Sequence, residues 1–233
     1  MLDIPGKARR KDFKKLRIEH IMIDDEDESM KILGISGSNR KDGNSYLLLK
    51  EALQEVSPIE RKIIQVAELQ IGPCKLCFES CSLKPYECAI EDDFGIVLEE
   101  MKSADEIVIA CPFYFYIPSR FQAFLERLSC VDYFTEERHG KGLSPLAKKP
   151  CALIVVSASG SGFNAFQILH HLQEFALTLG MLPVTTNKWP YIGLSAKSDD
   201  MERGAILKQT ETISESKQFV RLLINEIEKR ASK

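Results

Sequence analysis

The sequence predicts an α/β fold in which helices cover both faces of a five-stranded parallel sheet, a three-layer sandwich. Short runs rich in Ile and Val alternate with longer amphipathic segments, which is typical of strand–helix units around a parallel sheet. A chain of 233 residues with 44% hydrophobic residues can also bury the core of one full-sized domain. Finally, 31 basic and 34 acidic residues are spread along the chain, so we expect neither nucleic acid nor a membrane surface as a partner.

The elements follow in chain order. Strands are predicted at residues 31–36, 61–66, 106–111 and 151–156, with a weaker one within 181–191. Helices are predicted near residues 44–56, 92–103, 118–130 and 162–179, and a long last helix is predicted over 199–230, opened by the cap-like Ser198. Two long loops remain, at residues 67–91 and 132–149, and loops of this length are often functional.

Residues 1–29 differ from the rest because they are dense in charge and lack the apolar stretch of a secretory signal. We therefore expect a charged N-terminal extension, followed by one domain over residues 30–233, in a cytoplasmic protein. The apolar run "IVIACPFYFYIP" is too short to span a membrane and contains prolines.

The segment "GISGSNRKDGNS" joins the first predicted strand to the first helix. Its glycines let the backbone approach an anion, its serines and Arg40 offer donors, and Asn44 opens the helix at its positive end. The spacing lacks the lysine of a nucleoside-triphosphate loop and does not match the dinucleotide pattern G-x-G-x-x-G. The segment therefore favours a monophosphate site, and an ordinary capped turn is the alternative.

Four of the seven cysteines lie in "CKLCFESCSLKPYEC", with the spacing C-x2-C-x3-C-x6-C: Cys74, Cys77, Cys81 and Cys88. In a cytosolic chain with an odd number of cysteines, such clustering indicates metal or redox chemistry rather than a disulfide framework. An iron-sulfur cluster, a zinc ion, and thiols or occasional disulfides without metal are all open. Cys111, Cys130 and Cys151 lie in apolar segments, and we expect them in the core.

From about residue 31 to 191 the chain resembles the NAD(P)H-dependent FMN reductases of flavodoxin-like fold, in particular their iron-sulfur flavoprotein branch. The resemblance rests on "GISGSNRKDGNS", "CAIEDDFGIV", "ADEIVIACPFYFYIPSRFQAFLER" and "LIVVSASGSGF", in that order. It implies the strand order 2-1-3-4-5. The chain departs from the family where lysine and aspartate are common, at Gln122 and Glu126, although it keeps Arg127. It also has three residues between Cys77 and Cys81, where the family usually has two.

The resemblance also implies the cofactors and the residues that bind them. The first loop would surround the phosphate of FMN with Ser36, Ser38, Asn39, Arg40, Gly43, Asn44 and Ser45. The flavin ring would be contacted by Pro112, Phe113, Tyr114 and Phe115 after the third strand, and by Ser157, Ala158, Ser159 and Gly160 after the fourth. The four clustered cysteines would ligate a [4Fe–4S] cluster. Because the flavin supplies the chemistry, no side chain is assigned as catalytic.

We accordingly expect an FMN-dependent oxidoreductase or electron-transfer flavoprotein that couples a [4Fe–4S] cluster to FMN. A ferredoxin-like protein would be the electron donor, with NAD(P)H as a possible co-substrate and a small molecule as acceptor. The alternatives are a cluster-free NAD(P)H-dependent reductase of flavins, quinones or nitro compounds, and a non-enzymatic flavodoxin-like carrier with a zinc knuckle. The exposed apolar run "PFYFYIP" predicts a homodimer or homotetramer.

Overall fold

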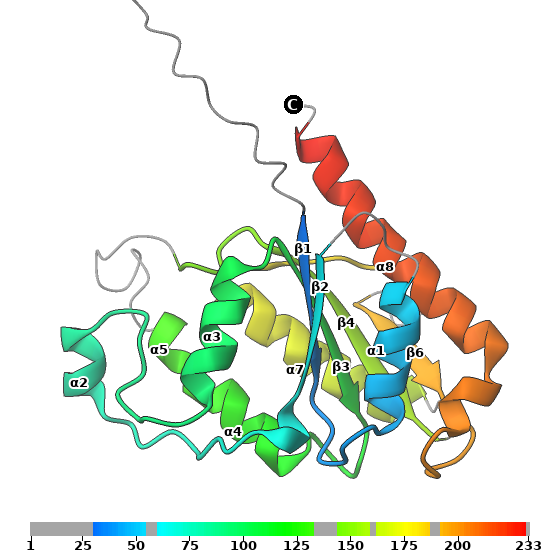
Figure 1. Cartoon of the computed structure of the whole chain (residues 1–233), viewed down its shortest axis with the longest axis horizontal. Helices are drawn as coiled ribbons and strands as arrows, with labels where there is room; N and C mark the ends of the chain where they lie inside the picture. The colour runs from blue at the N-terminus through cyan, green and yellow to red at the C-terminus, as the bar shows by residue number, and fades with distance from the viewer. Residues whose placement is uncertain (1–29, 55–59, 133–143, 159–161, 187–191, 232–233) are drawn as a thin grey trace, which may run out of the picture.

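The computed structural model describes residues 30–54, 60–132, 144–158, 162–186 and 192–231. The predicted extension at residues 1–29 lies outside the described residues. The core is a parallel sheet between two layers of helices (Figure 1). Its strands run in the order β2-β1-β3-β4-β5, as the resemblance implies. The first four strands along the chain are β1 (Lys31–Ser36), β2 (Glu60–Gln65), β3 (Glu106–Pro112) and β4 (Pro150–Ser157).

The alternation of side chains along each strand divides the core into two halves. On one face, Leu33 and Ile35 of β1 pack under α3 (Phe94–Ser103), α4 (Ser119–Arg127), α5 (Ser129–Asp132) and α7 (Gly162–Thr178). On the other face, Ile32 packs under α1 (Asn44–Gln54) and α8 (Thr210–Ala231). Figure 1 shows these two helical layers on opposite sides of the sheet. Nearly every residue of β3 and β4 is buried, as expected for parallel strands covered on both faces.

The fifth position of the sheet is shared by two short strands. The weak strand predicted within 181–191 is reduced to β5 (Leu182–Pro183), which pairs with the start of β4. A strand that the sequence did not predict, β6 (Leu194–Lys197), pairs with the end of β4 at Ile154–Ser157. Four residues without a long apolar run give too weak a pattern for prediction. Residues 187–191 lie outside the described part of the chain.

The prediction that the last helix begins at residue 199 is wrong, because α8 begins at Thr210. Asp199 and Gly204 have φ values of 62° and 85°, in the left-handed region that interrupts a helix. The Ser198 hydroxyl donates to the carbonyl of Asp200 at 2.8 Å instead of capping a helix. A short 3₁₀ helix, η2 (Ala205–Lys208), then leads into α8.

Smaller differences occur elsewhere. The helix predicted over 118–130 is divided into α4 and α5, and the long loop of the cysteines contains η1 (Val66–Glu68) and α2 (Phe78–Leu83). In the described part of the chain, no helix is both long and apolar enough to cross a membrane.

Candidate functional site

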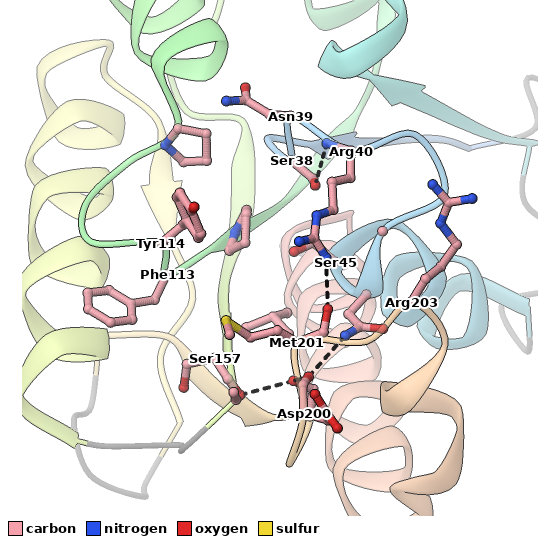
Figure 2. Close-up of a pocket in the computed structure, with 17 residues that line it drawn as sticks. Ser38, Asn39, Arg40, Ser45, Phe113, Tyr114, Ser157, Asp200, Met201 and Arg203 are labelled. Atoms are coloured by element: carbon pink, nitrogen blue, oxygen red, sulfur yellow. Dashed lines mark hydrogen bonds between the residues drawn. The ribbon is translucent and has the colours of Figure 1, made fainter.

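A pocket of about 300 Å³ opens where β1, β3, β4 and β6 end at their carboxyl edges (Figure 2). Open α/β sheets place their ligands at this edge. The pocket brings together most of the residues that the sequence assigns to FMN: Ser38, Asn39, Arg40, Gly43, Asn44, Ser45, Pro112, Phe113, Tyr114, Ser157 and Ala158. Ser159 and Gly160 lie outside the described residues.

The loop between β1 and α1 has little room for side chains. At Gly37, an added Cβ would lie 2.5 Å from the Phe121 ring of α4, so only glycine fits this close approach. At Gly43, a Cβ would lie 2.9 Å from the Ser38 hydroxyl. That hydroxyl accepts a hydrogen bond from the Arg40 N–H at 3.0 Å, which folds the loop back on itself. The two glycines therefore keep the loop compact at the mouth of the pocket.

The start of α1 carries the clearest sign of an anion site. The first N–H groups of a helix have no intrahelical partner, and they form its positive end. Ser45, in this first turn, is only 1% exposed and lines the pocket, yet its hydroxyl has no hydrogen-bond partner among the described residues. A phosphate oxygen in the pocket would satisfy such a donor. The hydroxyl of Ser36 is also buried without a described partner, although Ser36 does not line the pocket.

The side chains of Arg40 and Asn44 have a second role that the sequence did not reveal. Arg40 Nη1 donates to the carbonyl of Met201 at 2.8 Å, and Asn44 Nδ2 donates to that of Glu202 at 2.9 Å. The Asn44 Oδ1 atom accepts the N–H of Gly204 at 3.0 Å. These bonds hold residues 198–206, hereafter the clamp segment, against the loop before α1 (Figure 2).

The clamp segment supplies most of the pocket residues that sequence reasoning missed: Ser198, Asp200, Met201 and Arg203, besides Pro118 and Val156 elsewhere. In Figure 2, Arg203 lies across the pocket from Phe113 and Tyr114. The segment "SDDMER" has the pattern of a helix start, and nothing in it indicates contact with a loop some 160 residues earlier.

The opposite wall of the pocket follows β3 and β4. The N–H of Phe113 donates to the carbonyl of Val156 at 2.8 Å, which extends the strand pairing into the pocket. Tyr114 and Tyr116 then exchange backbone hydrogen bonds across a tight turn. Phe115 occupies the tip of that turn with φ of 58° and is 94% exposed, and it is not among the pocket-lining residues.

None of the four clustered cysteines lines this pocket. Burial, followed by the neighbouring Cys77, Cys88 and Cys74, raises the pKa of Cys81 to about 11, so the four thiols share one neighbourhood. Among the described residues, however, no group of three or more His, Cys, Asp or Glu side chains has an arrangement that could hold a metal ion. Donors to sulfur are present, because the Leu76 N–H points at Cys74 Sγ from 3.4 Å.

An ion pair between the buried Arg127 and the half-buried Asp92 closes the base of the cysteine loop. Arg127 forms a two-pronged pair with Asp92, at 2.7 and 3.1 Å, and Asp92 also accepts the N–H groups of Gly72 and Phe94. Burial acts to raise the pKa of Asp92, but these hydrogen bonds, led by the one from Arg127, hold it below its ordinary value. Burial likewise acts to lower the pKa of Arg127, but hydrogen bonds to Asp92 and Cys88 raise it overall. The pair is therefore charged at neutral pH.

The other three cysteines are buried, as predicted. Burial raises the pKa of Cys151 to about 12 and that of Cys111 further, which makes these thiols inert.

Comparisons with known proteins identify the family of the chain. Residues 30–191 match the family model of the NADPH-dependent FMN reductases. An iron-sulfur flavoprotein of Methanocaldococcus jannaschii is 41% identical over 88 residues, which cover 37% of this chain and 45% of that protein. An iron-sulfur flavoprotein of Methanosarcina thermophila is 34% identical over 101 residues, which cover 42% of this chain and 52% of that protein. The aligned part thus spans about half the length of these relatives.

Solved structures agree on the fold. A flavone reductase superposes with a TM-score of 0.58 over 82% of this chain and 60% of its own, at 21% sequence identity. This similarity concerns the fold alone, whereas the match to the family model covers most of the chain. The chain therefore belongs to the NADPH-dependent FMN reductases, a family of flavin-dependent oxidoreductases with a flavodoxin-like fold.

Proposed function

We propose that the protein is an FMN-dependent oxidoreductase that couples a [4Fe–4S] cluster, held by the cysteine loop, to FMN in the pocket. One observation carries the flavin assignment: the buried hydroxyl of Ser45, without a described partner, in the first turn of α1 and against the pocket. Membership in the family supports FMN as the ligand.

The residues present fit FMN. The phosphate would lie at the loop before α1, where Ser45, Ser38 and the first N–H groups of the helix offer donors and Arg203 adds positive charge. The ring would lie toward Phe113 and Tyr114, with Ala158 at its edge. Bound FMN would accept and release electrons singly or in pairs. The chain's residues bind and orient it and shield it from water, and NAD(P)H and a small-molecule acceptor would approach the open side.

The cysteine loop fits a cluster in the chemistry of its donors. Iron-sulfur clusters are ligated by thiolates and tuned by hydrogen bonds to sulfur, and the loop offers four thiols with such donors nearby. Zinc sites of four cysteines usually combine two C-x2-C pairs, whereas only the first pair here, Cys74 and Cys77, has that form. The names of both archaeal relatives support iron and sulfide over zinc. A ferredoxin-like protein is the proposed one-electron donor.

A second function rests on a different observation. Since no three donors among the described side chains are arranged around a common centre, the chain is also compatible with a cluster-free NAD(P)H-dependent reductase of flavins, quinones or nitro compounds. The two functions differ in metal content. Anaerobically purified protein should contain FMN, iron and acid-labile sulfide. FMN without iron and sulfide would leave the cluster-free reductase, and a protein without FMN would contradict both.

The phosphate placement is tested by Ser45→Ala. A hydrogen bond to a charged group contributes about 1.5–3 kcal/mol, so the dissociation constant of FMN should rise at least about tenfold, measured by fluorescence titration of the flavin-free protein. Riboflavin, which has no phosphate, should bind both proteins equally. Ser103→Ala is the matched control, because that exposed hydroxyl donates to the Glu100 carbonyl in α3. An unchanged FMN affinity in Ser45→Ala would place the phosphate elsewhere.

A further inference from the structure

Arg127 is a charged side chain that lies 39 residues from Cys88 in the chain, and no sequence pattern associates it with the cysteines. It lies in the last turn of α4, is only 1% exposed, and points under the cysteine loop. Burying a guanidinium group is costly unless its donors are paired. A fully buried arginine at this place therefore requires partners for all five of its N–H groups.

All five groups have partners. Two go to the Asp92 carboxylate, as described above, and Nη1 and Nη2 also donate to the carbonyls of Gly72 and Ile90, each at 3.1 Å. The remaining donor, Nε, points at Cys88 Sγ from 3.1 Å. The guanidinium carbon lies 4.7 Å from the centre of the Phe94 ring, which fixes its plane from one side.

These contacts join the two ends of the cysteine loop. Gly72 precedes the first cysteine. Cys88 is the last cysteine, and Ile90 and Asp92 follow it. Arg127 thus fixes the distance between the ends, and it directs one charged hydrogen bond at a thiol of the set. Hydrogen bonds and positive charge at a ligating sulfur stabilise the reduced, more negative state of an iron-sulfur cluster.

We propose that Arg127 is a positioning residue for the cluster: it closes the base of the cysteine loop and raises the cluster's reduction potential through Nε–H···Sγ of Cys88. This inference rests on the proposed function, since it requires a cluster in the loop. Asp92 orients the guanidinium group and offsets part of its charge, so it lowers the same potential.

The same helix supplies a matched control. Arg120 also reaches toward the start of this loop, where its Nη1 lies 3.3 Å from the carbonyls of Ala67 and Leu69. It is exposed and contacts no sulfur among the described residues. Arg120→Lys therefore removes an arginine contact with the loop but leaves the cysteines untouched.

The experiment compares the wild type, Arg127→Lys, Asp92→Asn and Arg120→Lys as whole chains purified anaerobically. Iron, sulfide and FMN are quantified, and the midpoint potential of the cluster is measured by an EPR-monitored redox titration. Lysine keeps the charge but cannot pair all five partners. Arg127→Lys should therefore disfavour reduction about tenfold, a downward shift of about 59 mV for one electron, with FMN content unchanged. Asp92→Asn should shift the potential upward, and Arg120→Lys should leave it unchanged.

Opposite shifts of the midpoint potential in Arg127→Lys and Asp92→Asn would distinguish tuning of the cluster from simple damage to the loop. Damage would not shift the two potentials in opposite directions. Loss of iron from Arg127→Lys with FMN retained would also support the positioning role. If Arg127→Lys does not fold, Asp92→Asn decides, and an unchanged potential there overturns the inference. Equal potentials in wild type and a cluster-containing Arg127→Lys overturn it as well. A wild type without iron and sulfide would instead overturn the proposed cluster itself.

Discussion

Glu106 stands at the first position of β3 with its side chain completely shielded from solvent, and neither carboxylate oxygen has a hydrogen-bond partner among the described residues. Burial, with a smaller contribution from the charge of Asp105, raises the pKa of Glu106 from 4.5 to about 8. Between these two values the folded chain keeps a proton that the unfolded chain releases. The free energy of unfolding should therefore fall as the pH rises from 4.5 to 8, by up to about 1.4 kcal/mol per pH unit.

Glu106→Gln tests this dependence at the level of one residue. The variant keeps the shape of the protonated side chain and cannot ionise, so the fall in stability between pH 5 and 8 should become shallower and the variant should be the more stable protein at pH 8. Urea unfolding at several pH values measures both effects. Glu99→Gln is the control, since Glu99 is an exposed partner of Lys102 in α3. Parallel stability profiles for wild type and Glu106→Gln would contradict the raised pKa.

At the scale of elements, the sequence predicted the loop before α1 because all of its signals are local. The glycines, the hydroxyl groups and the start of the helix all lie inside the twelve residues of "GISGSNRKDGNS". The clamp segment could not be predicted in the same way. Its acidic start is typical of a helix N-terminus. Its observed position depends on the left-handed conformations of Asp199 and Gly204 and on hydrogen bonds with the distant Arg40 and Asn44.

Asn44→Ala is predicted to release the clamp segment. The variant loses the acceptor for the N–H of Gly204 and the donor to Glu202, each hydrogen bond contributing about 1 kcal/mol. Backbone amide exchange in residues 200–206 should accelerate about tenfold or more, measured by hydrogen–deuterium exchange mass spectrometry, and FMN should bind more weakly. Gln54→Ala, at the other end of α1, should change neither. Unaltered exchange in the segment would show that β6 and η2 hold it without Asn44.

At the scale of the whole molecule, the alternation of strands and helices was enough to predict the parallel sheet. It was not enough to predict that two short strands, β5 and β6, pair with β4 at the edge of the sheet. β5 and β6 are too short to show a period, and their place depends on pairing with opposite ends of β4. The sequence also predicted Phe115 as an FMN residue. The turn of Tyr114 and Tyr116 instead directs its side chain into solvent, and this turn could not be predicted from the sequence.

That exposed turn predicts self-association. Tyr114, Phe115 and Tyr116 form an exposed aromatic group, and Phe163 of α7 is also exposed, an arrangement that favours contact with a second copy of the chain. Phe115→Asp should weaken a homodimer or homotetramer by about 2 kcal/mol or more, seen by light scattering as dissociation at micromolar concentration. Leu222→Asp, on α8 over the opposite face of the sheet, should leave the oligomer intact. A monomeric wild type would contradict the prediction.

Because the pocket and the cysteine loop use different residues, we predict that FMN and the proposed cluster can be lost independently. No residue of the cysteine loop lines the pocket, so Cys77→Ser should lose iron and sulfide while FMN remains bound. Reduction by a ferredoxin-like one-electron donor should then collapse, whereas direct reduction of the bound flavin by NAD(P)H should persist because it requires only the ring and an open side. Metal analysis, the visible spectrum and stopped-flow reduction measure the three effects.

Cys151→Ala is the control for Cys77→Ser, since Cys151 is buried in β4 and belongs to the core. It should keep both cofactors and both reduction rates. If Cys77→Ser lost FMN together with iron, the loop and the pocket would depend on one another despite their separate residues. If it kept its activity with the one-electron donor, electrons would reach the flavin without the cluster, and the cluster-free reductase would be the better description of the protein.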